Sequence, residues 1–232
     1  MALIVRIDVD RPYGKTPFLR HVLSRLGSDI YCPRVEALGY LKELEVILQM
    51  LNEAGARAYI FFRRCTLPTK SILELIDAGG HEIGLHLENS RSFETFCNEK
   101  AMLERYIGRP VASVSKHGSG KKKYGFHHYA PYEPDKYIRW ARKSGMKVFL
   151  GNLEDPTIRP LEGETDLQVY PAAFWLEPSW RDTRRFTIKW LLAQASVSDI
   201  VLLMHPDNVL ADPSLTEDLK SLLSSLDTRL LT

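Results

Sequence analysis

Residues 2–10 read ALIVRIDVD, a run of aliphatic and β-branched residues that contains one arginine and ends in two aspartates. This composition is typical of a buried β-strand. Residues two apart in a strand point to the same face, so Arg6, Asp8 and Asp10 share one face while Val9 points to the other. The segment therefore predicts a buried strand that carries a pair of carboxylates at its carboxyl end.

Short apolar runs of this kind alternate with amphipathic stretches along the whole chain. Strands that alternate with helices are typical of a parallel sheet with right-handed crossovers. We therefore predict an α/β fold with about seven strands, as a barrel or an open doubly wound sheet, in a single domain over residues 1–232. The expected strands are 2–10, 57–62, 81–86, 111–117, 146–152, 166–175 and 199–205. The expected helices are 35–55, 68–78, 92–107, 134–144, 182–195 and 215–226, and the stretches 11–34, 117–132 and 153–165 are expected to be irregular.

The composition narrows the classes of partner. Lysine and arginine number 31 against 29 acidic residues, and the net charge of +2 is too balanced to indicate a nucleic-acid partner. No run approaches the roughly 18 apolar residues of a membrane span, so no membrane partner is expected. The first ten residues carry no basic leader and no apolar signal core, and we expect a cytoplasmic location.

Polar residues stand where the expected strands end. Active sites of parallel α/β folds lie at the carboxyl ends of the strands, so these residues are the candidates for a functional site. They are Asp8 and Asp10, His86, Ser115 and His117, Asn152 with Glu154 and Asp155 just beyond, and His205 followed by Asp207.

The carboxylate pair of the first strand needs a cation close by. Two carboxylates held together repel one another unless a positive charge compensates one of them. A divalent metal would do this and would leave the other carboxylate free to act as a base. Arg6 is the alternative cation, since it lies on the same face and could pair with Asp8 in a buried salt bridge.

The stretch HEIGLHLENS at residues 81–90 holds two histidines of different expected roles. His81 and His86 are five residues apart and fall on opposite faces of an extended strand, so one metal is not expected to bind both. His81 is expected to be structural. His86 shares its face with Gly84, whose missing side chain would leave room for a metal or a substrate.

These motifs, in this order, resemble those of the polysaccharide deacetylases of carbohydrate esterase family four, over most of the chain. The matching segments are IDVD (7–10), GHEIGLH (80–86), SKHGSG (115–120), NLED (152–155) and LLMH (202–205). The resemblance implies a distorted TIM-like barrel of about seven strands, which agrees with the strand count above.

The resemblance also implies a function and a set of roles. Asp8 would match the catalytic base, Asp10 and His86 the metal ligands, and His205 the general acid. The activity implied is metal-dependent hydrolysis that removes an acetyl or similar acyl group from an amide or ester of a carbohydrate or related small molecule. The cofactor would be a divalent metal, with zinc first and nickel, cobalt, manganese or iron as alternatives.

The chain departs from the family's pattern in two motifs. Ser90 stands where the family has a second metal-binding histidine, and a neutral hydroxyl is a poor ligand for zinc-like ions. The third motif lacks its usual arginine and proline and carries Lys116 and His117 instead. We hypothesise that His117 completes a ligand set of Asp10, His86 and His117. Ser90 could act through a bridging water or cap the following helix.

The loop over residues 117–137 is rich in lysine, histidine and tyrosine and follows a strand end directly. It could be a lid with aromatic residues for sugar faces and lysines (Lys121, Lys122, Lys123) for a phosphate or carboxylate, or a solvated loop. His127 and His128 are reserve metal ligands. The expected substrate contacts are Ser115, Lys116, Tyr129, Trp175 and Arg181, with Trp180 as a further candidate.

Two other functions stay open at this point. One is a metal-free barrel that binds a glycan or nucleotide sugar without catalysis, which the serine at position 90 and the altered third motif favour. The other is a hydrolase of cyclic amides or phosphoesters. The partner is in each case a small molecule or an oligosaccharide, and the oligomeric state is open, with a homo-oligomer among the possibilities.

Overall fold

The computed structural model describes residues 2–14, 18–30, 34–120, 122–161 and 166–231. The strands of this part of the chain form one parallel sheet with the order β6-β5-β4-β3-β2-β1-β8-β7. They are β1 (Leu3–Val9), β2 (Ala58–Phe62), β3 (Glu82–Leu87), β4 (Ser113–Lys116), β5 (Val148–Leu153), β6 (Gln168–Ala172), β7 (Phe174–Trp175) and β8 (Ile200–Met204).

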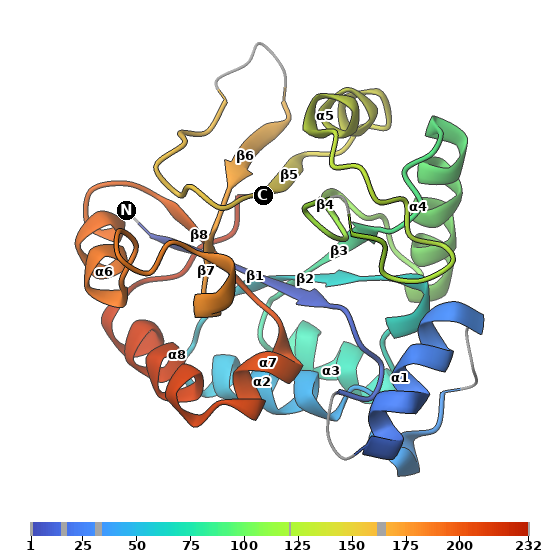
Figure 1. Cartoon of the computed structure of the whole chain (residues 1–232), viewed down its shortest axis with the longest axis horizontal. Coiled ribbons are helices and arrows are strands. Elements are labelled where there is room, and N and C mark those ends of the chain that lie inside the picture. The colour runs from blue at the N-terminus through green and yellow to red at the C-terminus, as the bar shows by residue number, and fades with distance from the viewer. Residues whose placement is uncertain (1, 15–17, 31–33, 121, 162–165, 232) are drawn as a thin grey trace.

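The sheet curls into a nearly closed, distorted barrel (Figure 1). Its two edge strands, β6 and β7, are consecutive pieces of one segment that bends at Ala173. The first piece pairs with β5 and the second with β8, so the backbone itself joins the two edges of the sheet. The stretch 166–175, expected as a single strand, thus serves both edges, and the predicted TIM-like barrel is confirmed.

Helices surround the strands (Figure 1). The predicted helices are all present, but the one expected over 35–55 begins at Lys42, after a short 3-10 turn, and the one expected over 182–195 begins at Ile188. The helix α1, at Phe18–Ile30, lies in the stretch 11–34 that was expected to be irregular, so that prediction was wrong. The other helices are α2 (Lys42–Glu53), α3 (Lys70–Ala78), α4 (Phe93–Ile107), α5 (Pro134–Lys143), α6 (Ile188–Ala195), α7 (Pro206–Ala211) and α8 (Pro213–Ser225), with short 3-10 turns at Glu36–Leu38, Arg64–Thr66 and Pro178–Trp180.

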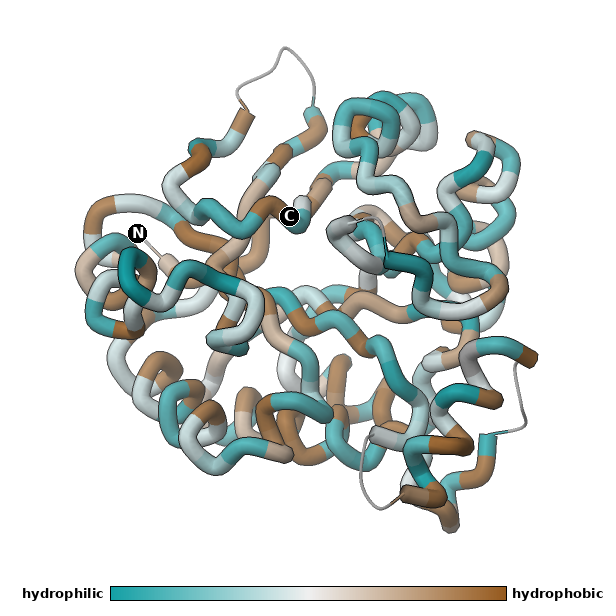
Figure 2. The backbone as a smooth tube through the Cα atoms, viewed as in Figure 1, coloured by the Kyte–Doolittle hydropathy of each residue, from teal (hydrophilic) through white to brown (hydrophobic). Residues whose placement is uncertain are grey.

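Alternation along the strands separates two hydrophobic cores. Leu3, Val5 and Ile7 of β1 pack outward in the large cluster that includes the helices. Ile4 belongs to a smaller cluster whose buried members all come from strands or the bend between β6 and β7, which places it inside the barrel. Figure 2 shows the apolar character of the strands and of the helix faces that cover them. Arg6 and Asp8 follow Ile4 on the inner face, as the parity of the sequence predicted.

The barrel interior changes character along its axis. Aliphatic and aromatic side chains fill the amino-terminal part, whereas polar side chains follow at the carboxyl ends of β1, β3, β4, β5 and β8. In the described part of the chain, no helix combines the length and the apolar character needed to cross a membrane.

Candidate metal centre

Three side chains from three strand ends converge at the carboxyl end of the barrel. Asp10 follows β1, His86 lies near the end of β3, and His117 follows β4. Oδ1 of Asp10 lies 3.0 Å from Nε2 of His86 and 2.9 Å from Nδ1 of His117, and the two ring nitrogens are 3.2 Å apart. Among the described residues, this is the group of histidine and carboxylate ligands with the spacing for a metal ion.

The donor set fits a divalent metal. Ligand atoms that share such an ion at about 2.1 Å lie roughly 3.0 to 3.4 Å apart, close to the distances found here. Burial raises the pKa of Asp10, but the neighbouring His117, His86 and His205 outweigh it and hold that pKa well below its usual value. Burial, together with the guanidinium of Arg63, holds the pKa of His117 well below its usual value. An ionised carboxylate and a neutral imidazole are the protonation states that metal binding requires.

Neighbouring groups hold the imidazole of His86 and the backbone of His117. Nδ1 of His86 lies 2.7 Å from the hydroxyl of Ser115, which leaves Nε2 to face Asp10. The backbone of His117 is held by its N–H donating to the carbonyl of Leu87. Its own carbonyl accepts from Nζ of Lys116 and, at 2.8 Å, from Nε2 of His128. The contact with Ser115 is of the kind that selects the ring nitrogen that faces a metal.

Ser90 lies outside the ligand group. It is fully buried, and its hydroxyl is 3.2 Å from that of Tyr137 on α5. The cap of the following helix α4 is Ser92, so the suggested capping role of Ser90 was wrong. The role expected of Gly84 was also wrong: a Cβ there would meet the ring of Phe61 at 2.2 Å, so the glycine makes room for that ring instead of a ligand.

Arg6 and Asp8 form a buried ion pair beside the candidate ligands. Nε and NH2 of Arg6 donate to the two oxygens of Asp8 at 2.9 and 2.6 Å. Its remaining N–H groups donate to the carbonyls of Leu150 and Gly151 and to Oδ1 of Asn152. Oδ2 of Asp8 is 3.6 Å from Nε2 of His86, so the pair borders the ligand group.

His205 faces the same space from the end of β8. Its Nε2 is 3.6 Å from Oδ2 of Asp10, and its Nδ1 is 2.8 Å from Oε1 of Glu177. The same oxygen accepts from the backbone N–H of His205 and from the amide of Asn208. Burial lowers the pKa of His205, but Glu177, Asp10 and Asp8 more than reverse this and raise it to about 10. This imidazole therefore holds two protons at neutral pH.

A cavity of about 410 Å³ opens over these groups. Asp8, Asp10 and the three histidines His86, His117 and His205 form its floor. The walls come from α1, from the loop after β4 and from the segment after β7. They include the aromatic residues Tyr124, Trp175 and Trp180 and the cations Arg11, Arg25, Arg63, Lys122 and Lys123.

Several residues expected to contact substrate do not line this cavity. Trp175 does, but Ser115 and Tyr129 do not. Lys116 is 1 % exposed and donates to the carbonyl of His117, and Arg181 donates to the carbonyls of Trp175, Leu176 and Phe186.

The other candidates of the sequence lie as follows. His81 is buried away from the cavity, where its ring bonds Asn52 and accepts the N–H of Ala58, as expected for a structural residue. In the 152–155 motif, Asn152 lines the cavity, whereas Asp155 caps a turn at Thr157. Lys121 lies outside the described residues.

Two residues of the site escaped the sequence analysis. Arg63 follows β2 directly, donates to the carbonyl of Asp10 at 2.9 Å and pairs with buried Glu88. The strand-end rule would have found it, had it been applied to β2. Glu177 follows β7, and only the fold brings it to His205, which is 28 residues further along the chain.

Comparisons by sequence give no relative: no family model matches, and no curated protein matches. Solved structures of similar fold do exist. One is a CE4 family pseudoenzyme from Bacillus anthracis, 14% identical, with a TM-score of 0.50 over 96% of this chain and 59% of the other. A mutant of that protein, described as having restored enzymatic activity, matches with the same score over 61% of its length. A glycoside hydrolase/deacetylase from Parabacteroides distasonis is 8% identical, with a TM-score of 0.53 over 97% of this chain and 65% of the other.

The present chain thus spans about three fifths of the length of these solved chains. The match extends over nearly the whole barrel, although few residues are identical. In its fold, the chain is therefore similar to solved structures of carbohydrate esterase family four, as its motifs indicated.

Proposed function

We propose that this chain is a metal-dependent hydrolase that removes an acetyl or similar acyl group from an amide or ester of a carbohydrate or related small molecule. The observation that carries the proposal is the convergence of Asp10, His86 and His117 on one point, between Asp8 on one side and His205 on the other. Asp10, His86 and His117 would hold a divalent metal, with zinc the first candidate. When bound, such an ion makes water a stronger acid and polarises the substrate carbonyl.

Asp8 is the candidate general base. Its carboxylate borders the ligand group at 3.6 Å from His86, where the attacking water would be held. The Arg6 guanidinium compensates its charge and fixes both oxygens in position. A base held in this way loses little orientation freedom when it accepts a proton from water.

His205 is the candidate general acid. Glu177 holds its Nδ1, so that Nε2 faces the cavity and carries the proton for the leaving nitrogen or oxygen. A doubly protonated imidazole can donate this proton at neutral pH. The aromatic walls at Trp175, Trp180 and Tyr124 suit the apolar face of a sugar ring, and the cavity volume lies in the range of ligand pockets, about 300 to 1,000 Å³.

Metal analysis joined to a hydrolysis assay tests the proposal. The purified chain should contain one equivalent of a divalent metal, and it should release acetate from acetylated amino sugars or sugar esters. The Asp8→Asn variant should keep the metal but lose activity by roughly 100-fold or more, because the proton acceptor is removed while the three candidate ligands stay. The Asp10→Asn variant should lose the metal. A metal-free wild type that stays inactive after loading with zinc, cobalt, nickel, manganese or iron would falsify the assignment.

The Arg6–Asp8 pair favours a second candidate, a barrel that binds a glycan or nucleotide sugar without turning it over. Both oxygens of Asp8 are engaged by Arg6, so a base at this position has to share its acceptors. In that case Asp8→Asn would leave glycan binding nearly unchanged, and wild type would release no acetate. Calorimetric titration of both proteins with the same sugars separates the two functions.

A further inference from the structure

Helix α1 is attached to the barrel by polar groups. The hydroxyl of Ser24 accepts the N–H of Tyr13 at 3.0 Å and donates to the carbonyl of Gly14. Arg20 pairs with Glu43 of α2 at 2.9 Å. Among the residues of this helix whose burial is described, Ser24 and Gly27 are buried, and Leu23 is half-buried against the core. The fully buried positions are thus small residues, whereas an ordinary surface helix turns a whole apolar stripe toward the core.

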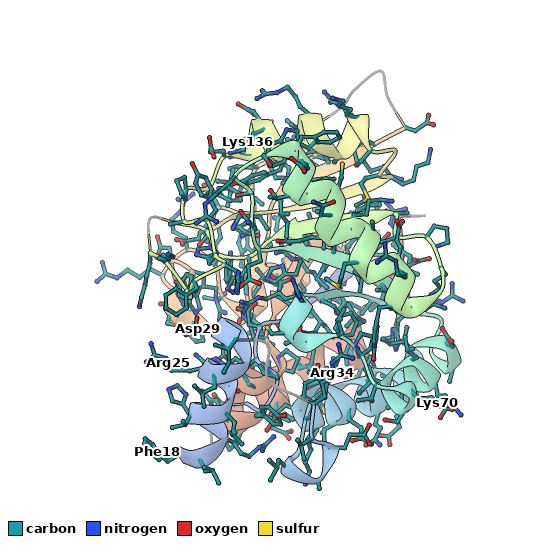
Figure 3. The ribbon with its side chains drawn as sticks, turned by 90° about the vertical axis from the view of Figure 1, so that its right-hand side faces the viewer. Phe18, Arg25, Asp29, Arg34, Lys70 and Lys136 are labelled. Carbon is teal, nitrogen blue, oxygen red and sulfur yellow. The ribbon has the colours of Figure 1, made fainter. Side chains whose placement is uncertain are left out.

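Four large apolar residues of α1 are exposed, although Leu23 packs partly against the core. Phe18 is 81% exposed, Leu19 63%, Leu26 44% and Ile30 66%. Phe18, Leu26 and Ile30 are eight and four residues apart, a spacing that spreads them over about 120° of the helix surface, with Ser24 on the opposite side. Figure 2 shows the apolar positions of this helix at the margin of the molecule, and Figure 3 shows Phe18 pointing away from the body.

Phe126 extends this surface. It is 70% exposed, and its N–H donates to Asp29 near the carboxyl end of α1. We call Phe18, Leu19, Leu26, Ile30 and Phe126 the α1 stripe. Single exposed apolar residues are ordinary, but large exposed groups gathered on one helix mark an interaction surface.

Cations flank the α1 stripe. Arg25 is exposed on the helix itself, and Lys122 and Lys123 line the cavity together with it. Beyond the carboxyl end of α1, Arg34, Arg64 and Arg105 line a groove of about 550 Å³. None of the described residues that line this groove is a carboxylate. Arg25, Asp29 and Arg34 are labelled in Figure 3, which faces this side of the molecule.

We propose that the α1 stripe docks on an anionic lipid surface. An outward apolar stripe rich in phenylalanine and leucine, flanked by arginine and lysine, is the pattern of a helix that lies in the membrane interface. The cationic groove would hold headgroup phosphates, and the stripe would enter the acyl boundary. A second copy of the chain is the poorer occupant, because a two-fold contact through the stripe would bring these like charges together. Such a contact lies on the membrane surface. It differs from a membrane span, whose absence was the reason that no membrane partner was expected from the sequence.

The docked surface would lie beside the mouth of the cavity, because His21, Ser24, Arg25 and Asp29 of α1 line its wall. This position favours acylated sugars that are carried on a lipid as substrates. That consequence rests on the proposed function. Docking itself can be measured without any activity.

Vesicle co-sedimentation of the whole chain tests the proposal. Vesicles of phosphatidylcholine mixed with phosphatidylglycerol should bind the chain, and high salt or pure phosphatidylcholine should weaken the binding. The double variant Phe18→Ser/Ile30→Ser should lower the partition coefficient by roughly tenfold or more, since two large apolar side chains leave the interface. Arg34→Glu/Arg105→Glu should lower it by at least about fivefold.

Matched controls replace exposed residues elsewhere. Val197→Ser removes an apolar side chain that is 60% exposed, and Lys70→Glu reverses a charge on α3; both should bind like wild type. Circular dichroism checks that every variant is folded. The proposal is overturned if wild type does not bind the anionic vesicles, or if the stripe variant binds as well as the controls. Sedimentation velocity that shows a dimer dissolved by Phe18→Ser/Ile30→Ser, without vesicle binding, would assign the stripe to a second copy instead.

Discussion

Both carboxylate oxygens of Asp8 accept hydrogen bonds from the guanidinium of Arg6, although Asp8 also borders the candidate metal ligands at 3.6 Å from His86. The sequence offered an ion pair and a metal as alternative partners for the two aspartates. In the structure the aspartates divide them: Asp8 faces Arg6, and Asp10 faces the histidines. Arg6 therefore compensates the charge of Asp8, and the carboxylate of Asp10 is left to face the two histidines.

The first prediction concerns the stability contributed by this pair. Arg6→Met should lower the free energy of unfolding by about 3 to 5 kcal/mol, because it leaves Asp8 as a buried charge without its partner. It also removes the donors to the carbonyls of Leu150 and Gly151. Urea unfolding of both proteins, followed by circular dichroism, measures the difference.

The double variant Arg6→Met/Asp8→Asn is the control for that loss. A neutral amide needs no guanidinium, so the double variant should be less destabilised than the sum of the two single changes. Simple additivity would show that Arg6 and Asp8 act independently, against the structure.

The second prediction separates the two places at which a third metal ligand was sought. His117→Ala should reduce metal affinity by more than the roughly 10- to 100-fold that loss of an outer partner costs, and Ser115→Ala should fall within that range. Ser90→Ala should leave metal content unchanged and cost about 1 kcal/mol of stability, through its hydrogen bond to Tyr137. Elemental analysis after dialysis against a graded chelator gives the affinities. Metal loss in the Ser90 variant with retention in the His117 variant would reverse the assignment.

The strands and the side chains that share a strand face were predictable from local rules, whereas the choice of a barrel over an open sheet came from the family resemblance. Alternation along residues 2–10 placed Arg6, Asp8 and Asp10 on one face, and parity separated His81 from His86. Both results need only the geometry of an extended chain. The bend that splits 166–175 between two sheet edges is different, because it depends on barrel closure, which no local pattern records.

Other features depended on partners that are remote in the chain or absent from the usual pattern. Helix α1 has apolar residues at helical spacing, but most of the large ones are exposed, so the usual link between periodicity and core gave little support. Glu177 meets His205 only because β7 and β8 are neighbours. Lys116 and Arg181 are a different case: they donate to backbone carbonyls close by in the chain, and these contacts follow from local turns that composition does not specify.

The third prediction concerns the proton on His205. Glu177 raises the pKa of this imidazole, so the acid form persists to a higher pH, and activity should fall only as pH rises past that pKa. Glu177→Gln removes the carboxylate, and the alkaline limb of kcat/KM should move to lower pH. Asn208→Ala is the matched control, since it removes a hydrogen bond to the same oxygen without removing the charge. Equal shifts in both variants would contradict a role for the charge of Glu177.

The last prediction uses His81, the histidine that parity removed from the site. Burial, with Arg57 nearby, lowers its pKa to about 4, so the folded state prefers the neutral ring that accepts the N–H of Ala58. A group whose folded pKa is depressed gives stability that is present above its unfolded pKa, about 6.5, and is lost as pH falls toward the folded value. Between pH 7 and pH 5, wild type should therefore lose about 2 kcal/mol of unfolding free energy that His81→Gln does not lose. Urea unfolding of both proteins at the two pH values isolates this difference, because the remaining titrating groups are common to them. Parallel losses in the two proteins would mean that His81 titrates alike in the folded and unfolded chains, which its bonds to Ala58 and Asn52 do not allow.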